Sequence, residues 1–219
     1  MSNPDLDVNL YISTQCPHCA QALELLTKAV KQGNISSLNI TNLNKVSAPE
    51  DYAHIRSVPF IQIQNFDFTG SITSAEIKEW EVAQKEGAFA KYYFSSLLNN
   101  GKISNTELFV KRNPDYLLVL VELAQDEQTK MQVRIGINAI FESLDAELLN
   151  ESLSNKIINS LIEASKTKNH AIRVDLIYLS SLMYLVVKDN LSNETLKIFL
   201  QSLINDDSEE IKEIINDVL

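Results

Sequence analysis

Apolar and polar positions alternate at the start of the chain and then change to a helical spacing. Val8, Leu10 and Ile12 fall on one side of an extended segment, which predicts a strand. Apolar residues then recur at helical spacing over 22–30, and Gly33 follows, which predicts a helix that ends at this glycine.

The same two patterns continue to residue 86. They predict strands at 38–40, 60–64 and 66–69, a short helix over 49–55 and a helix over 74–86. Ser74 is the predicted cap of the last helix, and because Ile77 stands three residues on, we expect a plain cap without a reciprocal glutamate. The order β-α-β-α-β-β-α predicts a right-handed βαβ unit followed by a hairpin, and hence a mixed four-stranded sheet.

From residue 89 onward only helical patterns occur. Three apolar–basic pairs, Val133-Arg134, Ile172-Arg173 and Ile211-Lys212, lie 39 residues apart. Each pair follows a polar turn, and each turn follows an amphipathic helix, which predicts an array of helical hairpins. The pattern resembles that of HEAT repeats and implies an α-solenoid of about three repeats; an irregular helical domain with coincident spacing is the alternative. In these repeats we expect Arg134 and Arg173 to bond neighbouring turns, with the binding of a partner as the alternative.

These patterns divide the chain into an α/β domain at 1–87, a helical connector at 88–112 and helical repeats at 113–219. The net charge of the whole chain is −10, and the helical half from residue 101 carries −7 of it. Such a surface repels phosphates, so nucleic acid is not an expected partner. Apolar runs fall short of the roughly 18 residues needed to span a membrane, and the first residues do not resemble a secretory signal. We therefore expect a cytoplasmic protein with no membrane partner.

The only two cysteines of the chain, Cys16 and Cys19, form one C-x-x-C motif. The motif follows a predicted strand and opens a predicted helix, where the free N–H groups and the helix dipole stabilise a thiolate at Cys16. Cys19, one turn later, is placed to resolve a mixed disulfide. Pro17 and His18 between them would tune the thiolate, since a protonated imidazole adds positive charge.

A metal site is the alternative use of this pair. A structural zinc site needs four ligands, and only three histidines are present in the chain to join the two cysteines. We therefore assign no metal ligand. A two-coordinate Cu(I) site needs only thiolates and stays open.

The Cys16-Pro17-His18-Cys19 motif, together with Val58-Pro59 before the strand at 60–64, resembles the thioredoxin-like disulfide oxidoreductases over about residues 6–86. The compact layout is most similar to glutaredoxins and short thioredoxin-like modules, whereas the CPHC motif is typical of DsbA-type oxidants. The resemblance implies a cis peptide bond before Pro59, facing the cysteines. It also implies that the backbone of Val58 binds an extended substrate segment as an added strand.

The sequence thus predicts a thiol–disulfide oxidoreductase that acts on a protein disulfide or dithiol, with the repeats selecting a protein partner. No nucleotide-binding fingerprint is present, so we expect no cofactor, and the electrons must come from another protein or a small thiol. A redox-sensitive adaptor, in which the repeats carry the function, is the main alternative, and a Cu(I)-binding chaperone is a further one.

Overall fold

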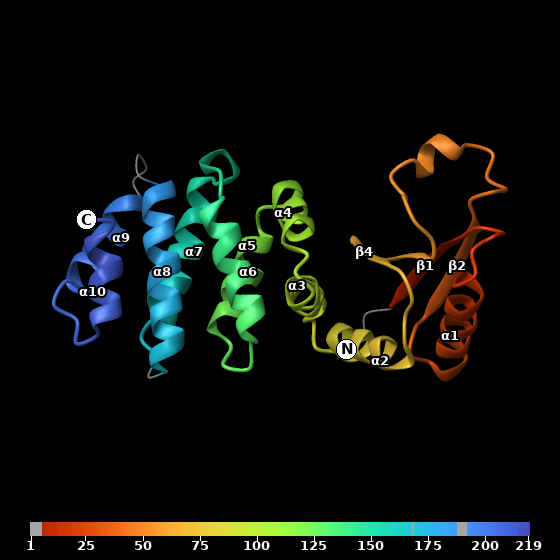
Figure 1. The fold of residues 1–219 in the computed structure, drawn as a ribbon, viewed down its shortest axis with the longest axis horizontal. Coiled ribbons are helices and arrows are strands. Elements are labelled where there is room, and N and C mark those ends of the chain that lie inside the picture. Colours follow the sequence, from red (N-terminus) through yellow and green to blue (C-terminus); the bar gives the residue numbers. More distant parts are fainter. Residues whose placement is uncertain (1–5, 168, 188–191) are drawn as a thin grey trace. The chain divides into compact units, whose positions relative to one another are not determined.

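The computed structural model describes residues 6–167, 169–187 and 192–219. The chain divides into two compact units, Met1–Tyr92 and Tyr93–Leu219 (Figure 1). Lys168, in one of the predicted repeat turns, lies outside the described residues.

Four strands form a single mixed sheet in the described part of the first unit. The strands are β1 (Asp7–Ile12), β2 (Ser37–Asn42), β3 (Phe60–Ile63) and β4 (Phe66–Thr69). Their order in the sheet is β2-β1-β3-β4, with β1 parallel to β2 and the other neighbours antiparallel. This topology confirms the predicted mixed sheet, and it places the carboxyl end of β1 beside the start of β3.

One face of this sheet is the core of the first unit. Leu10 pairs with Ile61, and both side chains are completely buried. Helices α1 (Cys19–Gln32) and α2 (Ser74–Lys85) contact each other, and Trp80 of α2 packs on Phe68 with 4.9 Å between ring centroids. The alternation of apolar residues along the strands is therefore explained by burial against these helices.

The start of α2 differs from the prediction. The capping residue is Thr73 rather than Ser74. The Thr73 hydroxyl accepts a hydrogen bond from the Glu76 backbone N–H, and the Glu76 carboxylate accepts one from the Thr73 N–H at 2.7 Å. This is a complete capping box. The predicted cap residue was therefore one position too late, and the expectation of a plain cap was wrong.

The short helix expected over 49–55 is a single 3-10 turn at Pro49–Tyr52. Tyr52 lies against Tyr11 of β1, with 5.7 Å between ring centroids. The turn thus brings an aromatic ring onto the face of the sheet opposite the Leu10 core, since Tyr11 alternates with Leu10 along β1.

The described part of the second unit contains helices and no strand. The helices are α3 (Phe89–Asn99, which begins in the first unit), α4 (Ile103–Arg112), α5 (Tyr116–Gln125), α6 (Met131–Glu142), α7 (Glu151–Ala164), α8 (His170–Val186), α9 (Ser192–Ser202) and α10 (Glu209–Asn216), with a 3-10 turn at Ala146–Leu148. This arrangement confirms the all-helical C-terminal region.

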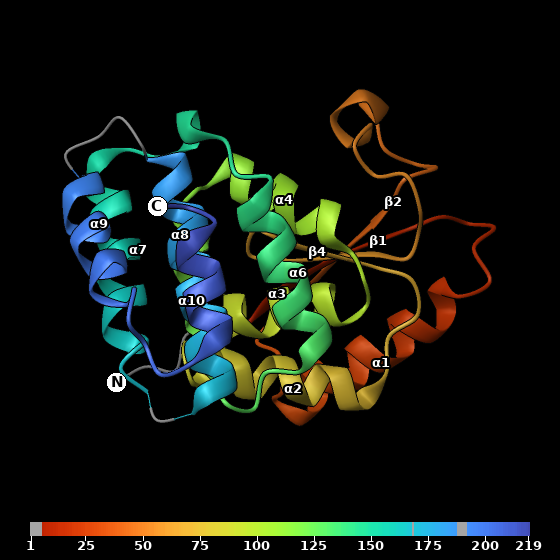
Figure 2. The ribbon, with the colours of Figure 1, turned by 60° about the vertical axis from the view of Figure 1, so that its left-hand side comes forward.

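From α5 onward the helices lie in two rows. Helices α5, α7 and α9 contact one another in succession, and so do α6, α8 and α10 (Figures 1 and 2). Gly136 marks a close approach between α6 and α3, because a β-carbon added there would lie 2.8 Å from Cδ2 of Leu98.

The two arginines at equivalent positions bond turns, as predicted. Arg134 donates to the carbonyl of Ala124, in the last turn of α5, at 2.7 Å, and to that of Asp126, in the turn that follows, at 2.6 Å. Arg173 pairs instead with Asp206, which precedes α10.

Candidate functional site

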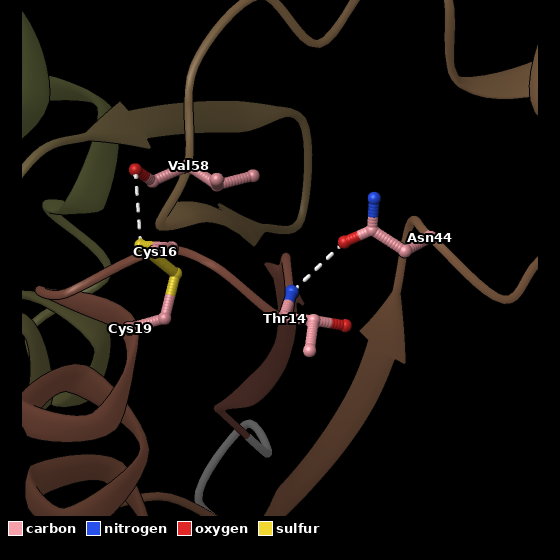
Figure 3. The surroundings of a disulfide bond; sticks show 5 residues. All are labelled: Thr14, Cys16, Cys19, Asn44 and Val58. Atoms are coloured by element: carbon pink, nitrogen blue, oxygen red, sulfur yellow. Dashed lines mark hydrogen bonds between the residues drawn. A yellow bond between two sulfur atoms is a disulfide. The ribbon is translucent and has the colours of Figure 1, made fainter.

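Cys16 and Cys19 are joined by a disulfide bond at the start of α1 (Figure 3). Cys16 lies in the loop after β1 and is half-buried, whereas Cys19 is the first residue of the helix and is 4% exposed. Pro17 and His18 between them are exposed. Cys16 is therefore the more exposed member of the pair, and we call its sulfur the outer sulfur.

The first turn of α1 favours negative charge at Cys16. A helix begins with N–H groups that lack helical partners, and they form its positive end. No acidic residue lies in the first turn of α1 to offset this end. His18 is the residue before the helix and makes no capping hydrogen bond with its side chain. The start of the helix therefore favours negative charge in the loop that carries Cys16.

The loop before β3 brings Val58 against the disulfide. The carbonyl oxygen of Val58 lies 3.5 Å from Sγ of Cys16, although the two residues are 42 apart in sequence (Figure 3). A disulfide sulfur carries no hydrogen, so this contact becomes a hydrogen bond only when Cys16 is reduced to a thiol that can donate. The Val58–Pro59 peptide bond is cis, the form that the resemblance implied. Val58 is half-buried and Pro59 is buried.

Two asparagines, one at the end of β2 and one just after it, hold the loop that carries Cys16. The Thr14 backbone N–H donates to Oδ1 of Asn44 at 2.8 Å (Figure 3). The Asn42 amide donates to the Thr14 hydroxyl at 3.3 Å, and the Asn44 N–H donates to Oδ1 of Asn42 at 3.1 Å. Sequence reasoning missed this network, whose only signal is the asparagine-rich segment at 42–44.

Aromatic side chains gather around Phe60, the residue after Pro59. The ring of Tyr11 lies 5.8 Å from that of Phe60, and the ring of His54 lies 6.1 Å from it. Burial, together with the neighbouring Tyr52 and Asp67, raises the pKa of Tyr11 above its ordinary value, so this phenol stays neutral at physiological pH. No sequence pattern indicates this cluster, because its members come from two strands and the loop between β2 and β3.

No group of three or more His, Cys, Asp and Glu side chains suited to a metal ion occurs in the ranges that the structure describes. Within those same ranges, no helix combines the length and the apolar character needed to cross a bilayer. The residues around Cys16 and Cys19 therefore form a disulfide site at a helix N-terminus, with a backbone carbonyl beside the outer sulfur.

No protein-family model matches the chain, and no curated protein sequence is significantly similar to it. The function of the protein is therefore inferred from the residues of the site and the fold around them.

Proposed function

We propose that the protein is a thiol–disulfide oxidoreductase of the thioredoxin-like type that acts on a protein substrate through Cys16 and Cys19. The observation that carries the proposal is the disulfide between these two residues at the positive end of α1, with the outer sulfur half-buried. The mixed sheet and the Val58–Pro59 loop beside Cys16 are further support.

In the oxidised protein, a substrate thiolate attacks Sγ of Cys16. The new sulfur–sulfur bond forms as the Cys16–Cys19 bond breaks, and Cys19 leaves as a thiolate that takes a proton from solvent. A second substrate thiolate then attacks the substrate sulfur of the mixed disulfide and releases Cys16 as a thiolate. Two electrons pass to the protein, and the substrate gains a disulfide. The same steps in reverse reduce a substrate disulfide.

The neighbouring residues take supporting roles in this proposal. Pro17 and His18 would set the stability of the Cys16 thiolate. The backbone of Val58, next to Pro59, would bind the substrate chain as an added strand, because its carbonyl already lies beside the reacting sulfur.

We propose that the two parts of the chain have separate roles in catalysis and in partner selection. A thioredoxin-like domain at 1–87 would be followed by a connector at 88–112 and about three HEAT-like repeats at 113–219, which would select the partner. The two rows of helices from α5 to α10 support the repeats. Exposed apolar residues on α6, Met131 and Ile135, favour the alternative of a redox-sensitive adaptor whose repeats carry the function.

The test is the reduction potential of the Cys16–Cys19 pair, measured by equilibration with glutathione or dithiothreitol buffers and alkylation of free thiols. Because the chain contains no other cysteine, every alkylated thiol reports on this site. A potential of about −270 mV would indicate a reductase, and one of about −120 mV would indicate an oxidant. In the Cys19→Ser variant a substrate should remain trapped on Cys16, whereas the Cys16→Ser variant should trap none. A pair that does not cycle in these buffers would overturn the proposal and favour the adaptor.

A further inference from the structure

Helices α6, α8 and α10 occupy equivalent positions in the 39-residue spacing and lie side by side in one row (Figures 1 and 2). The positions that face the neighbouring row are apolar in all three helices. Val133, Ile172 and Ile211, which are 39 residues apart, are each at most 5% exposed. The inward side of the row is therefore uniform and serves as core.

The outward positions of the same helices differ from one helix to the next. On α6 they are apolar: Met131 is 71% exposed and Ile135 is 51% exposed. The equivalents of Ile135 are Val174 on α8, which is half-buried, and Glu213 on α10, which is exposed. We call this surface the second-helix face and define it by Met131, Ile135, Val174, Tyr178, Glu213 and Asp217.

Side chains join the three helices on this face. The Tyr178 hydroxyl of α8 donates to Oε1 of Glu142 on α6 at 2.7 Å. His170 of α8 pairs with Glu210 of α10, with 3.1 Å between Nε2 and Oε2. Since both contacts link outward side chains, the face is continuous from α6 to α10.

Charge accumulates at the α10 end of the face. Over 209–217 the chain has four carboxylates and one cation, Lys212, which pairs with Glu209. Glu213 and Asp217 are both exposed. The negative end of the face repels the phosphates of nucleic acids and of anionic lipids, so these surfaces do not fit. A cationic protein segment fits by charge.

We infer that the second-helix face binds a segment of another protein that has apolar side chains at one end, over α6, and Lys or Arg at the other end, over α10. Met131 and Ile135 present apolar area that such a segment would cover, and the acidic end sets its direction. Packed helices lie about 8–10 Å apart, so the apolar and basic groups would be separated by roughly six residues of extended chain.

The bound segment would be the part of the substrate protein that the repeats recognise, and this role rests on the proposed function. The binding of the segment does not depend on that function. The binding itself involves neither cysteine. A double Cys16→Ser, Cys19→Ser variant should therefore bind the same segment, even if the protein proves to have no redox activity.

The experiment selects ligands from a random 12-residue peptide library displayed on phage, with the full-length protein as the target. Selected peptides are synthesised with a fluorescent label, and their affinity is measured by anisotropy at two salt concentrations. We expect selected peptides to carry an apolar group and a basic group at opposite ends. Ile135→Glu should weaken their binding about tenfold through the loss of apolar burial. Glu213→Lys should weaken it most at low salt.

Two substitutions in the other row of helices are matched controls. Ile198→Glu on α9 replaces an apolar residue that is 59% exposed, and Glu122→Lys on α5 reverses an exposed charge. Neither should change the affinity. Met131→Glu, at the first residue of α6, is a second test of the apolar end, and circular dichroism shows whether each variant is folded.

Three outcomes would overturn the inference. The first is a library that yields no binders or binders without basic residues. The second is equal loss of affinity in the controls and in the variants of the second-helix face. The third is a homodimer, detected by light scattering, that Ile135→Glu converts to a monomer, because a second copy of the chain would then cover this face.

Discussion

Replacing Arg134 by alanine should destabilise the helical unit by about 2–3 kcal/mol, because it removes a largely buried guanidinium and leaves the buried carbonyl of Ala124 without this donor. The Arg134 side chain is only 10% exposed. It donates to the carbonyls of Ala124 and Asp126, to that of Thr129 at 3.3 Å, and to the Asp175 carboxylate of α8 at 3.1 Å. A buried acceptor left unpaired, as the Ala124 carbonyl would be, costs about 1–3 kcal/mol, whereas the Asp126 carbonyl keeps the Thr129 N–H as a donor at 3.0 Å. Asp175 is 29% exposed, so water replaces part of its loss.

Arg173, 39 residues later, is the matched comparison. Its side chain is 26% exposed, and its bonds go to a single carboxylate, that of Asp206. Asp206 also accepts a hydrogen bond from the Ser208 N–H, so it keeps a partner when the arginine is removed. We therefore expect Arg173→Ala to cost only about 1–2 kcal/mol. Arg134→Met removes the hydrogen bonds but keeps an aliphatic side chain in their place. Comparing it with Arg134→Ala therefore distinguishes the cost of the lost hydrogen bonds from the cost of the lost packing.

Urea unfolding followed by circular dichroism at 222 nm measures these costs, since most helices belong to the second unit. The single tryptophan, Trp80, lies in α2 and reports on the first unit by its fluorescence. The reasoning would be refuted if Arg134→Ala and Arg173→Ala lowered the free energy of unfolding by equal amounts, or if Arg134→Met were harmless.

Three further substitutions test other local arguments. Gly136→Ala should destabilise the protein by about 1–2 kcal/mol in thermal unfolding despite the better helix propensity of alanine, because its methyl group meets the buried Leu98; in a Leu98→Ala background the same change should stabilise. The hydrogen bond from Arg173 lowers the pKa of Asp206, so the pair stabilises the fold above the unfolded pKa of about 3.9 and loses this effect as the pH falls through the lower folded value. Asp206→Asn should therefore cost about 1–2 kcal/mol at pH 7, with a difference from wild type that shrinks in unfolding curves below about pH 4. Thr73→Ala removes the capping box and should cost about 1 kcal/mol, measured by tryptophan fluorescence, and no change would contradict the capping geometry.

The strands and helices of the first unit could be predicted because burial of one face makes apolar residues recur at the spacing of a strand or of a helix. Val8 and Leu10 alternate with polar residues since only one side of β1 faces α1 and α2, and the helical spacing that ends at Gly33 has the same origin. The cap of α2 was missed although its signal is local: Thr73 and Glu76 form the capping-box spacing one residue before the chosen serine.

The surroundings of the cysteines could be predicted only in part. The pair itself and its place at a helix start follow from neighbouring residues. The contact between Val58 and Cys16 spans 42 residues and was expected only through a family resemblance. The Asn44 bond to the Thr14 backbone joins two loops whose meeting depends on the parallel pairing of β1 and β2. Polar side chains in loops have no periodicity, so no pattern in the sequence predicts which backbone groups they bind.

The basic residues of the three predicted repeats show where equivalence in sequence stops determining structure. Arg134 bonds the turn before its own helix, Arg173 bonds Asp206 ahead of the next second helix, and Lys212 pairs with Glu209 within its own first turn. The 39-residue spacing places each of these cations in the first turn of a helix, where its side chain can reach a nearby turn of the chain. The partner then depends on what that turn exposes: carbonyl groups after α5, and a carboxylate before α10. A shared position in the repeat thus predicts that the cation finds an acceptor close to a turn. The contribution of this bond to the free energy of unfolding depends on how deeply the acceptor is buried.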